Sequence, residues 1–313
     1  MRIRFWGVRG SIPTPLQPAR LKSKLSSVLQ RVTTKDIETQ ESRELFLASL
    51  PDYLFSTIGG NTACIEIQTG ENARFIFDAG TGIRDLGVEI AAFRKPVSCH
   101  IFFSHFHWDH IQGLPFFTPA FEAGNTMDFY SPVPDFRNIL ENQMHHPYFP
   151  VTMDLMSSVK RFNVLDGNPV RVGSVEVRYR AMHHPGGCYS YRIRERGHKI
   201  IYATDTELRE DDFQRTSENS DYFQNADVLV IDAQYTLGES LEKYNWGHSS
   251  FSLAADFAAT WGIKRLVLFH HEPSYSDRKI ESLYTNAKWY VEHLETNGVQ
   301  VLLAYEGLEL EVQ

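Results

Sequence analysis

SHFHWDH, residues 104–110, brings four side chains of metal-binding type together within six positions: His105, His107, Asp109 and His110. The apolar run IFF precedes it, as expected for the end of a buried strand. Because strand side chains alternate between two faces, His105 and His107 share one side, and the following turn carries Asp109 and His110 to a second point. Imidazole nitrogen and carboxylate oxygen suit zinc and similar metals. Two neighbouring groups of ligands therefore predict two metal ions.

Further polar residues end other apolar runs or stand in glycine-rich turns along the chain. In order they are Asp78 in FIFDAG, His183 and His184 in HHPGG, Asp205 in YATDTE, and His270 and His271 in LVLFHH. A buried strand with functional side chains at its carboxyl end is typical of α/β enzymes. The sequence thus predicts an α/β fold whose strand ends meet at one site.

The motif HxHxDH, followed by these segments in this order, resembles the metallo-β-lactamase superfamily. The resemblance covers nearly the whole chain. It implies a four-layer αββα sandwich, with two mixed sheets inside and helices outside. It also implies a single domain over residues 1–313.

The resemblance also implies a set of metal ligands. One divalent ion would be held by His105, His107 and His184, the other by Asp109, His110 and His270, and Asp205 would bridge them. Zinc is the expected metal, although manganese or iron fits mixed nitrogen and oxygen ligands too. Asp78 would support the ligands from behind. The choice of His184 over His183, and of His270 over His271, rests on position in the family motif.

Two features divide the family's branches. The zinc β-lactamases usually place cysteine or histidine at the position of Asp205, whereas thioesterase, glyoxalase II and phosphodiesterase branches keep aspartate. WGHSS, residues 246–250, resembles a histidine motif of tRNase Z-like phosphodiesterases. That likeness implies catalytic roles for His248, which would help protonate the leaving oxygen, and for Asp109, which would orient the nucleophile. The alternative for His248 is an ordinary polar residue at the start of a helix.

The segments FWGVRGSIP and GGNTACIEI also look like those of tRNase Z-like, cyclic-nucleotide and phosphonate-pathway phosphodiesterases. Arg9 and Asn61 in these segments could reach a phosphate, or could serve the structure alone. Tyr148 and Phe149 in PYFP could stack on a nucleobase, or could pack within their loop. The long basic arm of the tRNA processors has no counterpart between residues 119 and 154, which argues against tRNA as substrate.

Composition and charge exclude some classes of binding partner. The 313 residues include 39 acidic and 31 basic side chains, for a net charge of −8. No stretch concentrates Lys and Arg, so we expect no large nucleic-acid footprint, while a small phosphorylated ligand stays open. No apolar run reaches the roughly 18 residues of a membrane span, and the first residues lack the apolar middle of a signal peptide. We therefore expect a cytoplasmic protein without membrane contact.

Residues 15–57 interrupt the strand pattern with apolar residues at helical spacing, among them Leu21, Leu25 and Leu45. This pattern predicts one or two inserted amphipathic helices that bury an apolar face against the body or another subunit. A surface decoration, a lid and a homodimer contact are the alternatives. Two further helices are expected, one near residues 251–261 and one over about residues 281–296.

The expected function is hydrolysis of a phosphodiester in a small substrate by a metal-bridged hydroxide, with a cyclic nucleotide as one candidate. Hydrolysis of a thioester or a lactone on the same fold is the enzymatic alternative. A non-catalytic nucleotide-sensing module is the alternative from a different class.

Overall fold

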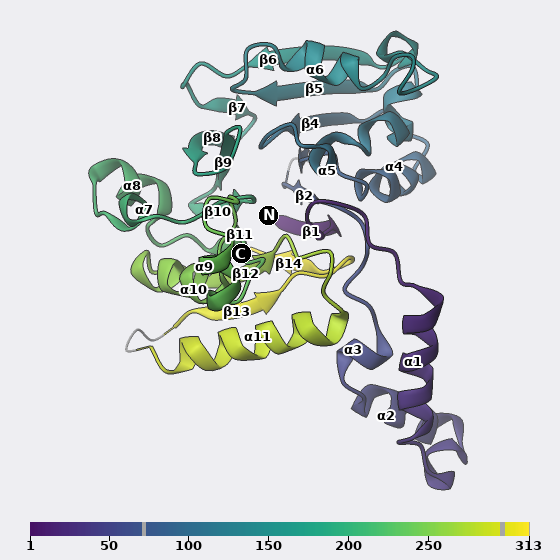
Figure 1. Ribbon diagram of the computed structural model, residues 1–313. Coiled ribbons are helices and arrows are strands. Elements are labelled where there is room, and N and C mark those ends of the chain that lie inside the picture. Colours follow the sequence, from purple (N-terminus) through teal and green to yellow (C-terminus); the bar gives the residue numbers. More distant parts are fainter. Residues whose placement is uncertain (71–72, 295–297, 313) are drawn as a thin grey trace.

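The computed structural model describes residues 1–70, 73–294 and 298–312, and its centre is a pair of seven-stranded sheets (Figure 1). The first sheet has the strand order β14 (Glu309–Glu311), β1 (Arg2–Gly7), β2 (Cys64–Gln68), β3 (Arg74–Phe77), β4 (Ser98–Phe102), β5 (Thr126–Ser131) and β6 (Val159–Val164). Strands β3 to β6 run parallel, whereas β14, β1, β2 and β3 pair antiparallel. The sheet is therefore mixed.

The second sheet also contains both parallel and antiparallel strands. Its order is β13 (Gln300–Leu303), β12 (Arg265–Phe269), β11 (Val228–Asp232), β10 (His198–Ala203), β9 (Cys188–Glu195), β8 (Val175–Met182) and β7 (Val170–Val172). Strands β10 to β13 are parallel, and β7 to β10 are antiparallel. Inner parallel strands such as β3, β11 and β12 carry the apolar runs, because helices cover them on the outside and the other sheet covers them on the inside, whereas the edge strand β6 is mostly exposed or half-buried.

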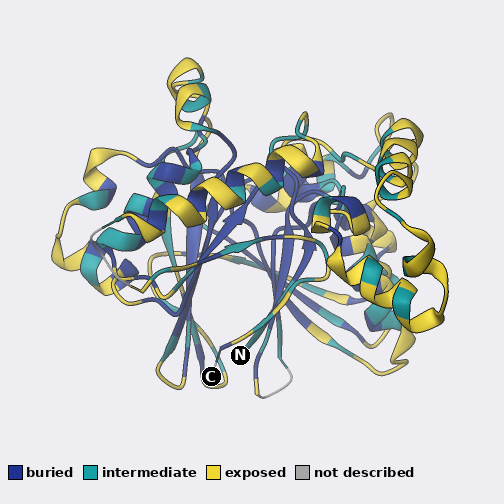
Figure 2. Cartoon of the chain, turned by 90° about the horizontal axis from the view of Figure 1, so that it is seen from below, coloured by how far each residue is buried: buried dark blue, intermediate teal, exposed yellow. Residues whose placement is uncertain are grey.

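Alternation along the strands separates three layers of core. In β3, Phe75 and Phe77 face the second sheet and pack in the central core with Tyr202 and Val267. Ile76, between them in sequence, points outward and packs under helices instead. Figure 2 shows the result, with buried strands inside and helices whose outer faces are exposed. This arrangement confirms the predicted αββα sandwich.

Helices cover the outer face of each sheet. Those over the first sheet are α4 (Ile83–Ala92), α5 (Trp108–Ile111) and α6 (Phe136–Asn142), with the 3₁₀ turns η2 (Leu114–Phe116), η3 (Thr118–Phe121) and η4 (Met153–Leu155) nearby in the chain. The helices that alternate along the chain with strands β10 to β13 of the second sheet are α7 (Glu210–Phe213), α8 (Ser217–Phe223), α9 (Leu237–Glu242), α10 (Phe251–Thr260) and α11 (Asp277–Glu292). Of these, α8, α10 and α11 bury apolar side chains against it. Within the described ranges, no helix is both long and apolar enough to cross a membrane.

Two expected helices are present with shifted bounds. Ser250 caps α10, since its hydroxyl accepts a hydrogen bond from the backbone N–H of Leu253. Helix α11 begins four residues earlier than the apolar pattern indicated, because Ser276 caps it in the same way. The predicted end at Thr296 lies outside the described residues.

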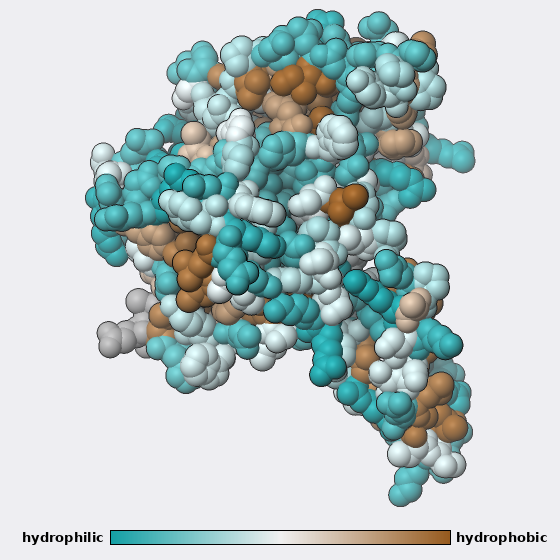
Figure 3. Space-filling view, viewed as in Figure 1, coloured by the Kyte–Doolittle hydropathy of each residue, from teal (hydrophilic) through white to brown (hydrophobic). Residues whose placement is uncertain are grey.

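The segment between β1 and β2 forms α1 (Pro18–Leu29), η1 (Thr34–Ile37), α2 (Gln40–Ser49) and α3 (Asp52–Phe55), which project from the body (Figure 1). The expectation that its apolar face is buried against the body is wrong for α1 and α2, which contain no buried residue. Leu21, Leu25 and Leu45 are exposed, and hydrophobic patches are visible on this lobe in Figure 3. Burial against another subunit stays a prediction.

Candidate metal centre

The site forms where strands of both sheets end. Asp78 follows β3, His105 lies three residues past β4, Asp205 follows β10 by two residues, and His270 directly follows β12. The carboxyl ends of parallel strands lie at one edge of a sheet, so these side chains meet. Asp78, Asp205 and His270 adopt φ values of 60°, 44° and 59°, a left-handed conformation that is costly for residues other than glycine. Sharp turns at the strand ends thus aim these side chains into the site.

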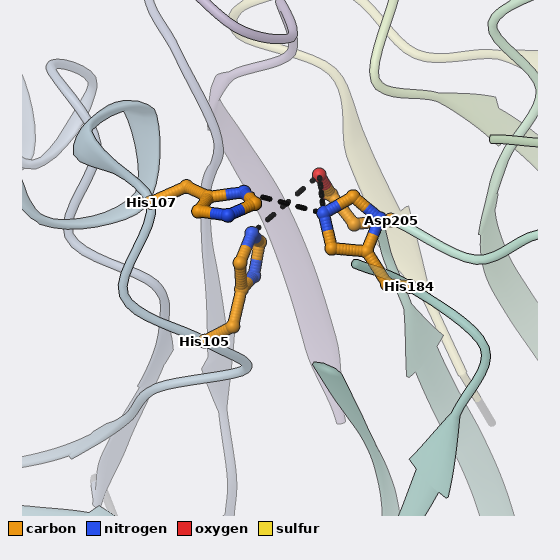
Figure 4. A group of neighbouring side chains, drawn as sticks. All are labelled: His105, His107, His184 and Asp205. Atoms are coloured by element: carbon orange, nitrogen blue, oxygen red, sulfur yellow. Dashed lines mark hydrogen bonds and ion pairs between the residues drawn. The ribbon is translucent and has the colours of Figure 1, made fainter. Parts of the chain in front are cut away.

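The first cluster consists of His105, His107, His184 and Asp205 (Figure 4). His184 Nε2 lies 3.2 Å from His107 Nδ1. Asp205 Oδ2 lies 3.7 Å from His105 Nε2 and 3.8 Å from His184 Nε2. Three imidazole nitrogens and one carboxylate oxygen therefore converge on one point, as for a four-coordinate divalent ion.

The second cluster uses the other oxygen of the same carboxylate. Asp205 Oδ1 lies 3.1 Å from both His110 Nε2 and His270 Nε2. Asp109 Oδ2 lies 3.2 Å and 3.3 Å from the same two nitrogens. Asp205 thus turns one oxygen to each cluster, so the structure brings together the seven residues that the family resemblance implied.

Other contacts fix which ring nitrogen faces each cluster. Asp78 Oδ2 accepts a hydrogen bond from His110 Nδ1 at 2.9 Å, and Tyr202 donates to the same oxygen at 2.8 Å. The backbone carbonyl of Gly247 accepts from His184 Nδ1 at 2.9 Å. A donor at Nδ1 leaves Nε2 with its lone pair, which is the form that binds a metal. Asp78 therefore contacts a residue of the second cluster from behind, the position that the family resemblance implied for it.

The donor set fits divalent metal ions. The Nε2 atoms of His105 and His110 are buried and make no hydrogen bond of good geometry with any described residue. Burial, followed by the charge of His110, holds the pKa of His105 well below its usual range. Burial also lowers the pKa of His110, but Asp205, Asp109 and Asp78 outweigh it and raise that pKa well above the usual value. The same negative field attracts a cation, so these residues could hold two metals of the kind that the fold family implies.

His248 lies beside both clusters. Its ring centre is 5.3 Å from that of His184 and 5.1 Å from that of His270. His248 Nδ1 lies 2.5 Å from Asp232 Oδ2, a carboxylate at the end of β11 that is completely buried. Burial lowers the pKa of His248, but the charge of Asp232 and its hydrogen bond raise it to about 9. This Asp–His pair leaves Nε2 as the ring nitrogen that can act on another molecule.

Sequence reasoning missed Asp232 as a site residue. The signal was its place at the end of the apolar run DVLVID, which is the same position that Asp78 occupies in FIFD. It also missed the reason for Gly247 in WGHSS. Gly247 has a φ of +89°, and a Cβ there would lie 2.1 Å from His184 Nδ1. Only glycine lets the backbone carbonyl reach the histidine at this point.

The histidines left out of the ligand set have other partners. His183 Nε2 lies 3.1 Å from a carboxylate oxygen of the exposed Asp211. His271 is buried, and its Nε2 donates to the carbonyl of Ala304 at 2.8 Å. Neither ring therefore points into the two clusters.

The two residues named as possible phosphate contacts are already hydrogen-bonded within the protein. Arg9 is 2% exposed and donates hydrogen bonds to the carbonyl of Gly59 and the carboxylate of Asp277. Asn61 donates to the carboxylates of Asp85 and Glu306. For both, these partners support the structural role, one of the two that the sequence left open.

The two aromatic residues of PYFP differ from each other. Phe149 packs edge-on against Phe116, with ring centres 5.6 Å apart. Tyr148 is 77% exposed, so its stacking on a base stays a prediction.

Comparison with known proteins agrees with this geometry. The model of the β-lactamase superfamily domain matches residues 73–271. A ribonuclease Z of Streptococcus pneumoniae (strain CGSP14) is 23% identical over 275 residues, which cover 71% of this chain and 87% of that protein. The human short-form tRNase Z superposes with a TM-score of 0.62 over 100% of both chains, at 18% identity. A diphosphatase of the PhnP family superposes with a TM-score of 0.63 at 15% identity, covering 100% of this chain and 98% of its own.

At these identities the solved structures establish the fold alone. The family model covers well over half of the chain, and the αββα sandwich and the paired ligand clusters are those expected of the family. This chain therefore belongs to the metallo-β-lactamase superfamily of hydrolases.

Proposed function

We propose that this chain hydrolyses a phosphodiester in a small substrate, with a cyclic nucleotide as one candidate. The observation that carries the proposal is the pair formed by His248 and the buried Asp232 beside the two ligand clusters. An alkoxide is a poor leaving group, and it departs faster when a positioned acid protonates it. A histidine held at Nδ1 by a carboxylate, beside the ligand clusters, is suited to that task.

His105, His107 and His184 would hold one divalent ion, Asp109, His110 and His270 would hold the other, and Asp205 would contact both. When bound, two such ions lower the pKa of a water molecule, so that it attacks at neutral pH, and they neutralise charge on a phosphoryl group. Zinc is the metal we propose, because imidazole nitrogen dominates the donor set.

Residues of the chain itself would donate the proton to the leaving oxygen and orient the nucleophile. Asp232 keeps the proton on His248 Nδ1 and fixes the plane of the ring. His248 Nε2 would carry the proton that passes to the leaving oxygen. Asp109 also accepts a hydrogen bond from the backbone N–H of Ser11 at 2.7 Å, which fixes its carboxylate within the second cluster. That anchoring suits the proposed role of Asp109 in orienting the nucleophile.

Two considerations favour a small substrate. The proteins similar to this chain include a ribonuclease Z and a diphosphatase, whose names describe hydrolysis of phosphate esters or anhydrides. The chain has a net charge of −8 and no stretch that concentrates basic residues, which does not suit a long nucleic acid. A cytoplasmic location would give access to such substrates and belongs to the same proposal.

A panel of substrates tests the proposal. Zinc-loaded protein would be assayed on bis(p-nitrophenyl) phosphate, 3′,5′-cyclic AMP, an acyl thioester, a lactone and a β-lactam. Turnover of the phosphodiesters in excess of the others is expected. Preferential hydrolysis of the thioester or the lactone would replace the proposal with its enzymatic alternative. Tight nucleotide binding without turnover of any substrate would favour the sensing module.

A further inference from the structure

A second polar cavity lies outside the metal centre, at the joint between the inserted lobe and the body. Its volume is about 310 Å³, at the lower end of the range for small-molecule sites. Helix α1 and α3 form one wall, and the amino end of α11 forms the other. Figure 1 shows α3 between α1 and this end of α11, and the surface at the joint is predominantly hydrophilic in Figure 3.

The lining of this cavity is strongly cationic. Its five basic residues are Arg9, Arg20, Lys24, Arg31 and Arg278, against a single carboxylate, Asp277. That carboxylate is already engaged, because Arg9 lies 3.2 Å and Lys24 2.5 Å from its two oxygens. The cavity therefore carries a clear excess of positive charge, in a chain whose net charge is negative.

The side chains of three of the arginines have no partner among the residues that the structure describes. The guanidinium groups of Arg20, Arg31 and Arg278 make no hydrogen bond or ion pair with any residue in the described ranges. Thr14, which also lines the cavity, has a buried hydroxyl oxygen without a hydrogen-bond partner among those residues. Arg20 also lies near enough to Arg9 to lower its pKa, after the larger effects of burial, which lowers it, and of Asp277, which raises it. Like charges gathered without compensation in a concave site are expected where an anion binds.

We propose that this cavity binds a small molecule with two or more phosphate charges. Guanidinium groups match phosphate oxygens through paired hydrogen bonds, and three unpaired arginines exceed what one phosphate requires. Hydroxyls of Ser23 and Ser27 add further donors on α1, whereas Leu16 and Tyr53 offer apolar surface for an organic part of the ligand. This site does not rest on the function proposed for the metal centre.

The cavity and the metal centre share one stretch of chain. Arg9 and Thr14 line the cavity, and between them Ser11 donates its backbone N–H to the proposed ligand Asp109. Gly10 lies against the ring of His270, since a Cβ at this position would be 2.5 Å from its Cε1. The ligand of the cavity would therefore bind one short segment away from two metal ligands.

Calorimetric titration with inorganic pyrophosphate tests the site in the zinc-loaded protein. The variant Arg20→Gln/Arg31→Gln removes two unpaired cations, and Lys22→Gln/Lys35→Gln removes the same charge from exposed positions of the same lobe that do not line the cavity. Pyrophosphate that binds the metal centre contributes equally to all three proteins. A charged hydrogen bond is worth about tenfold or more in affinity, so a loss of about 100-fold is expected for one binding event in the arginine variant alone.

Matching isotherms for wild type and the arginine variant would overturn the proposal, and so would an equal loss in the lysine variant. Neither guanidinium group contacts a described residue through a hydrogen bond or ion pair, so the arginine variant should fold, and circular dichroism and zinc content would check this. Arg278→Gln, on the opposite wall, gives an independent measurement, with an expected loss of about tenfold. Unchanged affinity in that variant would also count against the site. Failure here would leave the substrate panel on the metal centre unaffected, because that panel does not depend on these arginines.

Discussion

The pair formed by His248 and Asp232 gives the sharpest test of phosphoryl chemistry at the metal centre. If His248 protonates the leaving oxygen, His248→Ala should lower the turnover of substrates with alkoxide leaving groups by about 10²–10⁴-fold. Aryl phosphodiesters should lose far less, since an aryloxide departs almost without protonation. Comparison of 3′,5′-cyclic AMP with bis(p-nitrophenyl) phosphate measures this difference directly.

The contribution of Asp232 can be worked out from its contact. Its Oδ2 lies 2.5 Å from His248 Nδ1, and both side chains are largely or wholly out of solvent. A hydrogen bond to a charged group contributes about 1.5–3 kcal/mol, which corresponds to about 10–150-fold in rate if the whole of it acts in the transition state. Asp232→Asn should therefore cost less than His248→Ala on the same alkoxide substrate. Because Asp232 acts through His248, the double variant should be no slower than His248→Ala alone.

Control variants distinguish the acid role of His248 from metal binding and from a general effect of removing charge. Asp211→Asn changes another carboxylate that contacts a histidine, His183, at the exposed edge of the site, and it should leave the leaving-group dependence unchanged. Zinc content, measured by elemental analysis, should stay constant in every variant. Equal losses on the aryl and alkyl substrates would refute the acid role of His248. Loss of zinc would instead mean that His248 and Asp232, which group with His270, are ligands.

Three further predictions concern metal binding and stability. Elemental analysis of gently purified protein should give about two divalent ions per chain. Asp205→Ala removes the carboxylate shared by both clusters and should lower that number. An unchanged metal content in this variant would refute the shared role of Asp205. Gly247→Ala should weaken metal affinity about 10–100-fold in chelator competition by displacing His184, whereas Gly238→Ala, where an added Cβ meets nothing within 4 Å, should not. Burial lowers the pKa of His100 in the folded protein. As the pH falls below about 6.5, the imidazole therefore becomes protonated in the unfolded chain before it does in the folded protein, and the free energy of unfolding decreases. The melting temperature of His100→Phe should therefore fall less than that of wild type between about pH 7.5 and 5.5, and parallel declines would contradict this assignment.

The residues that form the two clusters were predictable, because both their place after apolar runs and their place in the family motif indicated them. His105, Asp205 and His270 each follow an apolar run, and such runs form parallel strands whose ends meet at one edge. The parallel direction of the strands is therefore enough to predict that residues distant in the sequence lie close together, even when no side-chain contact is known. Family position then settled the choice between adjacent histidines, such as His183 and His184, for which local pattern gives no preference.

Contacts between segments could not be predicted in the same way. Arg9 lies near the start of the chain, and its carboxylate partner is Asp277, so a local reading could not distinguish a buried ion pair from a phosphate contact. Asp232 and His248 are 16 residues apart and meet only because β11 ends beside the start of α10. In the insertion, the helical spacing of apolar residues correctly predicted helices. The same spacing does not determine whether the apolar face that includes Leu21 and Leu25 packs against another part of the protein, and in the structure this face is exposed.

Under the proposed function, the groups for chemistry and the groups for specificity lie at different places in this fold. The proposed metal ligands lie at or near strand ends, and three residues there, Asp78, Asp205 and His270, hold a left-handed backbone, a strain that the packed sheets must support. Groups that would choose the substrate, such as the exposed Tyr148, stand on loops, where the structure constrains the residue type far less. Arg20 and Arg31 belong to a lobe that buries no residue in α1 or α2, so packing does not account for their placement. Their convergence with the amino end of α11 is better explained by a ligand than by folding.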